Sequence, residues 1–122
     1  MTFDWSQYYV LATYLAGVTS RQTDPEARLR SAISRGYYAA FCMARNHLRD
    51  KSLYQPTETA EDHVRVSGCL VELGHQGIAA DLRRLRDCRN KADYRDVVPA
   101  PERLVQFALG LARRVLTQLP HV

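Results

Sequence analysis

The sequence has few glycines and lacks the alternation of a β-strand. Its 122 residues include six glycines, and 46% of the residues are hydrophobic. No stretch alternates apolar and polar residues as a half-buried strand does, so the composition argues against a sheet. A chain of this length forms one domain with a real core. We therefore expect an all-α fold over residues 1–122, an up-and-down bundle of four to five antiparallel helices in a single domain.

Cysteine is also scarce. Cys42, Cys69 and Cys88 are odd in number, lie far apart, and show neither a Cys-x-x-Cys pair nor a histidine at ligand spacing. This arrangement argues against a disulfide framework or a zinc site and fits a reducing cytoplasm. Cys88 stands beside Arg89 and is either an activated thiol or a small buried hydrophobe, and we expect the second. We expect no metal and no cofactor.

Long apolar runs and the familiar catalytic loops are missing as well. The longest apolar run, 37–44, is far too short to span a bilayer, and no charged-then-apolar leader opens the chain. There is no phosphate-cradling glycine loop, no Gly-x-Ser-x-Gly elbow and no paired-carboxylate motif. We therefore expect a cytoplasmic protein with no membrane contact, and most enzyme classes have no motif to support them.

The charges are distributed unevenly, although the formal net charge is only +4. The segment 27–49 contains five arginines and no acid, and the segment 83–95 contains six cations and two aspartates. The segment 50–81 between them is mostly acidic. This pattern predicts a positive face that suits phosphates or an acidic partner, but two ordinary solvated faces would produce the same distribution.

The first two helices have clear start and stop residues. We expect the first helix to begin near Asp4, which can cap its free amides, and to end at Gly17. The second helix starts at Asp24-Pro25, because an N-cap aspartate followed by proline is a strong start, and it runs to about Arg49. Small residues on the second helix let a neighbouring helix approach closely. These residues are Ala32, Gly36, Ala39 and Ala40.

Three further helices follow. Thr57 or Thr59 caps the third helix, which ends at Gly74. The fourth helix stops within a turn after Tyr94, because the following valine and proline residues cannot continue it. The fifth helix begins at Pro101 or at the next residue. The positions of the fifth helix that we expect to face inward are Leu104, Phe107, Ala108, Leu111, Ala112, Val115 and Leu116.

Arg89 stands where the pattern of the fourth helix requires an apolar residue. The apolar positions of that helix recur at Ile78, Leu82, Leu85 and Ala92. Steps of four, three and seven define one helix face, and Arg89 occupies the missing step. An inward guanidinium must find carboxylates, hydroxyls or a bound anion, since leaving it unpaired costs about 3–5 kcal/mol. Asp93, one turn further on, is the expected partner, in a network that either stabilises the fold or binds an anion.

The second helix carries a polar stripe at alternating steps of three and four. Its members are Arg28, Ser31, Arg35, Tyr38, Cys42, Arg45 and Arg49. Arginines with an interleaved tyrosine suit a phosphate backbone and a stacked base, although a solvated face or a face that meets another subunit explains the same stripe. The candidate binding or structural network around Arg89 comprises Ser31, Ser34, Arg35, Tyr38, Arg86 and Asp93.

The sequence places none of the four histidines beside Arg89. His47 lies next to the inward face of the second helix, and we expect it to be partly buried and satisfied rather than catalytic. His63 lies near the start of the third helix, His75 lies in a turn, and His121 lies near the end of the chain.

Two segments give the chain a family resemblance. The segment 29–41 reads LRSAISRGYYAAF, the segment 86–94 reads RDCRNKADY, and Asp4-Trp5 opens the first helix. Together they resemble the HEPN domain family of prokaryotes, in the branch with an Arg-x-x-Ala-Asp-Tyr motif, related to the HEPN partners of minimal nucleotidyltransferases. The resemblance covers nearly the whole chain. It implies a helical bundle that forms a homodimer and is often encoded beside a small nucleotidyltransferase in toxin–antitoxin or defence loci.

The resemblance also implies a candidate catalytic motif. Many HEPN members are metal-independent RNases that use an arginine, then a polar residue, then a histidine after four to six intervening residues. The histidine handles protons while a 2′-hydroxyl attacks the adjacent phosphate, and the arginine stabilises the developing charge. Arg89 and Asn90 match the first half of this motif. At the histidine positions this chain has Tyr94 and Asp96 instead.

The missing histidine decides the expected activity. A tyrosine titrates near pH 10 and an aspartate near pH 4, so neither is matched to proton transfer at about pH 7. Losing general acid–base catalysis removes about 10²–10⁴-fold in rate. We therefore expect a component that binds RNA, a nucleotide or a protein partner and has little or no RNase activity. The alternative is a metal-independent endoribonuclease toxin that uses Arg89 with Tyr94 or with a recruited histidine such as His63.

Overall fold

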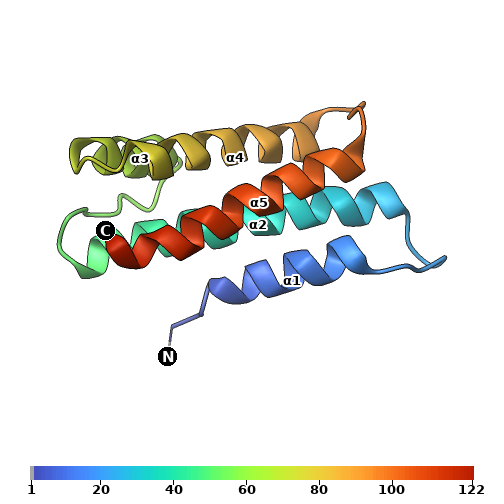
Figure 1. The fold of residues 1–122 in the computed structure, drawn as a ribbon, viewed down its shortest axis with the longest axis horizontal. Helices are drawn as coiled ribbons and strands as arrows, with labels where there is room; N and C mark the ends of the chain where they lie inside the picture. Colours follow the sequence, from blue (N-terminus) through green and yellow to red (C-terminus); the bar gives the residue numbers. More distant parts are fainter. Residues whose placement is uncertain (1) are drawn as a thin grey trace.

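The computed structural model describes residues 2–122, and these residues form helices and connecting loops without any strand. The helices are α1 (Ser6–Gly17), α2 (Pro25–Asp50), α3 (Asp62–Glu72), α4 (Gln76–Tyr94), α5 (Pro101–Gln118) and the short 3₁₀ helix η1 (Leu119–His121). The long helices α1, α2, α4 and α5 run in alternating directions along the chain (Figure 1). The predicted all-α bundle is therefore confirmed.

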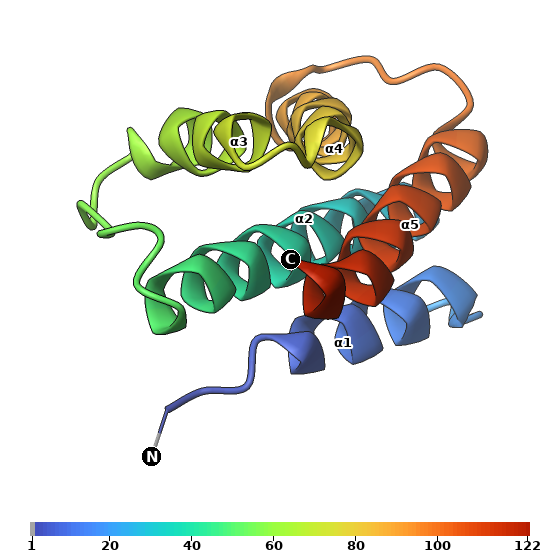
Figure 2. The same ribbon diagram turned by 60° about the vertical axis from the view of Figure 1, so that its left-hand side comes forward.

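Helix α2 is the centre of the bundle. It packs against α1, α3, α4 and α5, and α4 also packs against α3 and α5. Figure 1 shows α2 and α5 between α1 on one side and α3 with α4 on the other. Figure 2 shows α3 beside α4 and the loop that returns from the end of α2 to α3. This arrangement brings residues of α2, α3 and α4 together around one region.

Local chemistry explains most helix boundaries. The carboxylate of Asp24 accepts a hydrogen bond from a backbone N–H of the first turn of α2 at 3.1 Å, and Pro25 occupies the first helical position. Helix α1 ends at Gly17, α4 ends at Tyr94 and α5 begins at Pro101. These boundaries agree with the sequence predictions.

The predicted cap of α3 is wrong. Neither Thr57 nor Thr59 caps the helix, which begins at Asp62. The buried carboxylate of Asp62 accepts hydrogen bonds from the N–H and the hydroxyl of Thr57, from the N–H of Glu58 and from the hydroxyl of Tyr54. These bonds draw the loop 51–61 back onto the first turn of α3, so the threonines belong to the loop.

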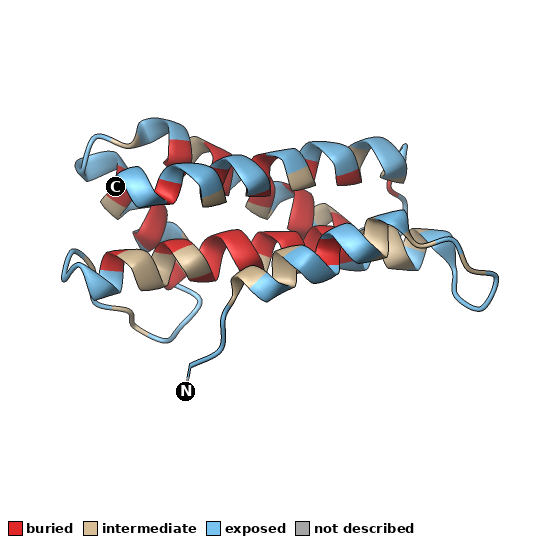
Figure 3. Ribbon diagram, turned by 60° about the horizontal axis from the view of Figure 1, so that its bottom comes forward, coloured by how far each residue is buried: buried red, intermediate tan, exposed pale blue. Residues whose placement is uncertain are grey.

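Buried residues line the facing sides of the long helices (Figure 3). The largest fully buried side chains on α2 are Tyr37, Ile33 and Leu48. Gly36 permits the close approach of α5, because a Cβ atom at this position would lie 2.9 Å from Cδ2 of Leu109. The small residues of α2 therefore serve packing within the chain.

Helix α5 buries only part of its apolar stripe. Phe107, which the pattern predicted to face inward, is 52% exposed, whereas Val105 is buried. The apolar stripe of α5 is wider than the surface that α2 and α4 cover, and Phe107 lies on the uncovered side.

None of the helices in residues 2–122 combines the length and the apolar character that crossing a bilayer requires.

Candidate functional site

Arg89 lies on the inner face of α4 and is only 7% exposed, as its place in the apolar pattern predicted. Its Cζ atom lies 5.3 Å from the ring centroid of Tyr37, 5.5 Å from that of Tyr38 and 6.0 Å from that of Tyr94. A guanidinium over an aromatic ring gains about 0.5–1 kcal/mol at an exposed site and about 2 kcal/mol when desolvated. The three rings therefore compensate in part for the water that Arg89 loses on burial.

The predicted carboxylate partner of Arg89 is close but engages it weakly. Nη1 of Arg89 lies 3.8 Å from Oδ2 of Asp93, and the same oxygen accepts a hydrogen bond from the hydroxyl of Ser34 at 3.3 Å. A charge-assisted hydrogen bond spans about 2.7–2.9 Å, so the pair is an ion contact without a strong bond. The buried Nε of Arg89 has no hydrogen-bond acceptor within residues 2–122. The guanidinium thus retains the capacity to bind an anion.

Arg89 belongs to a series of guanidinium groups and aromatic rings that crosses three helices. We call this series the arginine–aromatic ladder, and its members are Tyr8, Arg35, Tyr38, Arg89 and Tyr94. The Cζ atom of Arg35 lies 4.8 Å from the ring centroid of Tyr8 and 5.5 Å from that of Tyr38. Tyr38 therefore contacts both guanidinium groups and connects α1, through Arg35, to α4.

The members of the polar stripe that the sequence predicted on α2 have different surroundings in the structure. Two members of the stripe belong to the ladder. Arg45 lies farther along α2, with its Cζ atom 5.8 Å from the ring centroid of Trp5. Cys42 is buried, and Ser31 is exposed and makes no side-chain hydrogen bond to the other described residues. Ser31 therefore lies outside the Arg89 network, and Ser34 lies within it.

A further arginine of α2 holds the C-terminal end of α4. The guanidinium of Arg30 donates hydrogen bonds to the carbonyl oxygens of Ala92 at 3.2 Å, Arg95 at 2.5 Å and Asp96 at 3.2 Å. Glu26, one turn earlier on α2, forms an ion pair with Arg30 at 3.1 Å. The last carbonyl groups of a helix have no partner in the helix, and a cation at this end satisfies them. Arg30 therefore fixes the turn at which the ladder ends.

Helix α3 contributes a histidine that the sequence did not place at this site. Nδ1 of His63 is hydrogen-bonded to the hydroxyl of Tyr37, and the imidazole stacks on the ring of Phe41 with 4.2 Å between the centroids. The pKa of His63 is lowered to about 4 by burial and by the positive charges of Arg86 and Arg89. His63 is therefore neutral at pH 7.

Tyr37 connects this histidine to Arg89. Its ring faces the guanidinium of Arg89, and its hydroxyl contacts His63. Burial raises the pKa of Tyr37 well above that of an ordinary phenol, although Arg86 and Arg89 act in the opposite direction. Tyr37 therefore keeps its proton at neutral pH and can donate it in the hydrogen bond to Nδ1.

Tyr94 and Asn90, the two remaining members of the candidate catalytic motif, differ in their position relative to Arg89. Tyr94 is 74% exposed, and its ring approaches the guanidinium of Arg89. Asn90 is exposed and makes no side-chain hydrogen bond to any other residue of the range 2–122. The structure therefore brings Tyr94 to Arg89 and leaves Asn90 on the solvent-facing side of α4.

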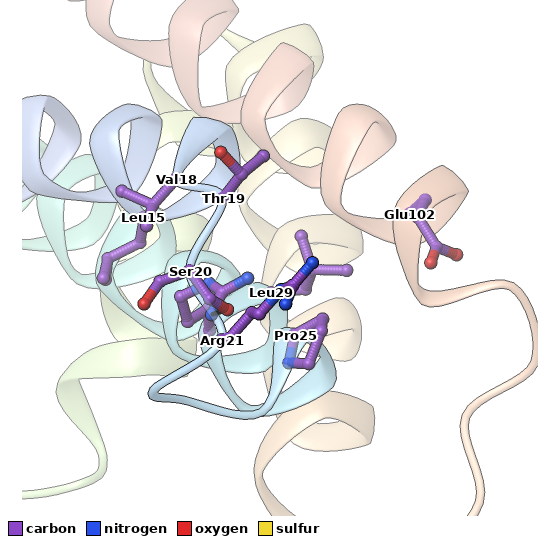
Figure 4. A pocket seen from close by; sticks show the side chains of 9 residues that line it. Leu15, Val18, Thr19, Ser20, Arg21, Pro25, Leu29 and Glu102 are labelled. Carbon is purple, nitrogen blue, oxygen red and sulfur yellow. Dashed lines mark hydrogen bonds between the residues drawn. The ribbon is translucent and has the colours of Figure 1, made fainter.

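A pocket of about 570 Å³ lies elsewhere, between the loop after α1 and the start of α5. Figure 4 shows Glu102 of α5 across this pocket from Leu15. Arg28 lines the pocket and donates hydrogen bonds to the carbonyl oxygens of Ser20 and Thr23 at 3.2 and 2.8 Å. These bonds order the loop after α1. No ladder residue lines this pocket, so we place the candidate site at the ladder.

No protein-family model, no curated protein and no solved structure matches this chain. Within residues 2–122 no group of three or more histidine, cysteine, aspartate or glutamate side chains is arranged to hold a metal ion.

Proposed function

We propose that this chain is a HEPN-like protein that binds RNA or a nucleotide through phosphate groups at the arginine–aromatic ladder and cleaves RNA weakly or not at all. The ladder is the observation that carries this proposal, because two guanidinium groups alternate with three rings over α1, α2 and α4. Proteins that bind single-stranded nucleic acid combine cations along the backbone with aromatic rings on which bases stack. The ladder supplies both kinds of group.

Other cations of α4 add to the attraction. Arg83 and Arg86 form no ion pair within the described part of the chain, whereas Lys91 is paired with Asp87 at 3.3 Å. Each cation that neutralises a phosphate releases a counterion, so affinity falls as the salt concentration rises. Salt-sensitive binding is therefore expected.

Weak cleavage follows from the residue types at the site. Tyr94 stands where the resemblance expects the catalytic histidine, and a phenol does not exchange its proton readily at neutral pH. Arg89 can stabilise charge on a phosphate without any proton transfer. Binding therefore does not depend on the missing histidine.

A metal-independent endoribonuclease toxin is the second candidate, and the contact between Tyr37 and His63 favours it. This contact hydrogen-bonds the imidazole of His63 to Tyr37, the same residue whose ring faces Arg89. However, a histidine with a pKa of about 4 is a weak base at pH 7, and Tyr37 already occupies its Nδ1. Binding therefore remains the first candidate.

The resemblance also supports a cellular context. We place the protein in the cytoplasm of a prokaryote, as a homodimer and as one component of a toxin–antitoxin or defence system with a small nucleotidyltransferase as its partner. Val97, three residues after the ladder residue Tyr94, is 77% exposed, and an isologous contact would cover it in both copies. The small residues of α2 pack within the chain and do not belong to this contact.

Fluorescence anisotropy with a labelled single-stranded RNA tests the binding site. Arg89→Met and Arg35→Met each remove one guanidinium of the ladder and should weaken binding about tenfold. Arg113→Met is the matched control, because Arg113 is exposed on α5 and lies outside the ladder. Equal affinity in all four proteins would place the RNA elsewhere.

A further inference from the structure

A cleft of about 210 Å³ opens between α2, α3 and α4, and Tyr37 and His63 both line it. Most of its lining is apolar and includes Phe41, Val64 and Leu82. None of the ladder residues lines this cleft. It is therefore a separate site that shares its wall with the ring of Tyr37.

The charged groups of the cleft are all of one sign. Arg83 and Arg86 line it, no aspartate or glutamate does, and neither arginine forms an ion pair within residues 2–122. Nε of Arg86 is buried and has no hydrogen-bond acceptor within the same residues. An acceptor with a negative charge would satisfy this group, which is costly to leave unpaired.

The other polar groups of the cleft are already engaged. The hydroxyl of Tyr37 is hydrogen-bonded to Nδ1 of His63, and the hydroxyl of Ser67 donates to the carbonyl oxygen of His63 at 3.5 Å. The uncommitted donors are therefore those of Arg83 and Arg86, together with Nε2 of His63, which carries the proton when Tyr37 donates to Nδ1. The cleft combines an apolar, partly aromatic body with a cationic end.

We infer that this cleft binds a small planar aromatic carboxylate, with its ring in the apolar part and its carboxylate on Arg86. Sites for drug-sized ligands measure about 300–1,000 Å³, so this smaller cleft suits one ring system with a single charged group. The guanidinium N–H groups match the two oxygens of a carboxylate.

Gly68 offers a way to close the cleft without disturbing the fold. This residue lines the cleft, and a Cβ atom at its position would meet no atom within 4 Å. Because Gly68 lines the cleft, a leucine side chain at this position would add bulk at the cleft without a clash at its Cβ atom. Gly110 on α5 has the same free surroundings but does not line the cleft, so Gly110→Leu is the matched control.

Isothermal titration calorimetry of the full chain with 2-naphthoate tests the inference. We expect one site per chain that Gly68→Leu abolishes and Arg86→Met weakens at least about tenfold, whereas Gly110→Leu leaves binding within about twofold. Arg84→Met is the charge control, because Arg84 is exposed on α4 and does not line the cleft. The uncharged 2-naphthamide should bind at least about tenfold more weakly than 2-naphthoate.

Three outcomes would overturn the inference: no binding of 2-naphthoate at millimolar concentration, equal binding by Gly68→Leu and the wild type, or equal binding of 2-naphthamide. Thermal unfolding of each variant shows that it is folded. The inference does not rest on RNA binding. Fluorescence anisotropy with RNA on the Gly68→Leu protein distinguishes RNA binding at the ladder from carboxylate binding in the cleft. RNA binding should persist in this protein, because only the carboxylate site is closed.

Discussion

Tyr37 and His63 lie 26 residues apart in the sequence, and the hydroxyl of the first is hydrogen-bonded to Nδ1 of the second. This contact joins α2 to α3, and the ring of the same tyrosine faces Arg89 on α4. A single phenol thus links the neutral histidine to the buried guanidinium. The pH dependence predicted below follows directly from this arrangement.

Stability should decrease as the pH falls from about 6.5 towards 4. The pKa of His63 is about 4 in the folded chain and near 6.5 in an unfolded one, so the unfolded chain binds more protons over this interval and is favoured. After allowance for solvent screening, the loss in the free energy of unfolding is on the order of 1 kcal/mol. Urea unfolding at several pH values measures it.

His63→Gln should flatten this part of the profile, whereas His121→Gln, at an exposed position, should leave it unchanged. Asp62 titrates at lower pH, because its hydrogen bonds outweigh the effect of burial and lower its pKa to about 2. Its contribution is lost only as the pH falls through about 4 towards 2. A wild-type profile that is flat between pH 6.5 and 4 would contradict the account of His63.

Asp93→Ala should lower the free energy of unfolding by about 1 kcal/mol. The substitution removes the oxygen that Arg89 and the buried hydroxyl of Ser34 share, and it leaves both without this partner. Asp87→Ala is the control, since Asp87 pairs with Lys91 on the exposed side of α4 and such a pair contributes about 0.3–0.5 kcal/mol. Chemical unfolding that shows equal losses for both variants would mean that Asp93 does not brace Arg89.

The chain should elute as a homodimer. Light scattering at micromolar concentration is expected to give about twice the chain mass of 13.9 kDa. Val97→Glu places a charge on the exposed surface of the proposed contact and should shift the protein to the monomer. Val10→Glu is the control, because Val10 is 57% exposed on α1, away from the proposed contact. A single species of the chain mass for the wild type would count against the dimer.

Much of the fold could be predicted because its signals are local. Asp24-Pro25, Gly17 and Pro101 define helix ends through caps and backbone restrictions that act within a few residues. The start of α3 could not be predicted in this way. It depends on hydrogen bonds that Asp62 receives from side chains and backbone of the preceding loop, and these have no periodic pattern.

The candidate site could be predicted only in part. The helical phase of α4 predicted that Arg89 is buried, and the stripe on α2 included Tyr38. The contribution of His63 follows from the way α3 packs beside α2, and no spacing in the sequence encodes that contact. Tyr8 joins the ladder for a similar reason, because the packing of α1 on α2 brings its ring to Arg35.

The most direct test of the central claim measures binding and cleavage of RNA in the same samples at pH 7 in the presence of EDTA. Labelled single-stranded RNA should bind the wild type in a salt-sensitive manner, bind Arg89→Met more weakly, and keep its full length in both. Strand scission that leaves 2′,3′-cyclic phosphate ends and is lost in Arg89→Met would contradict the claim. Its loss in Tyr94→Phe or in His63→Gln would then identify the residue that transfers the proton in an endoribonuclease.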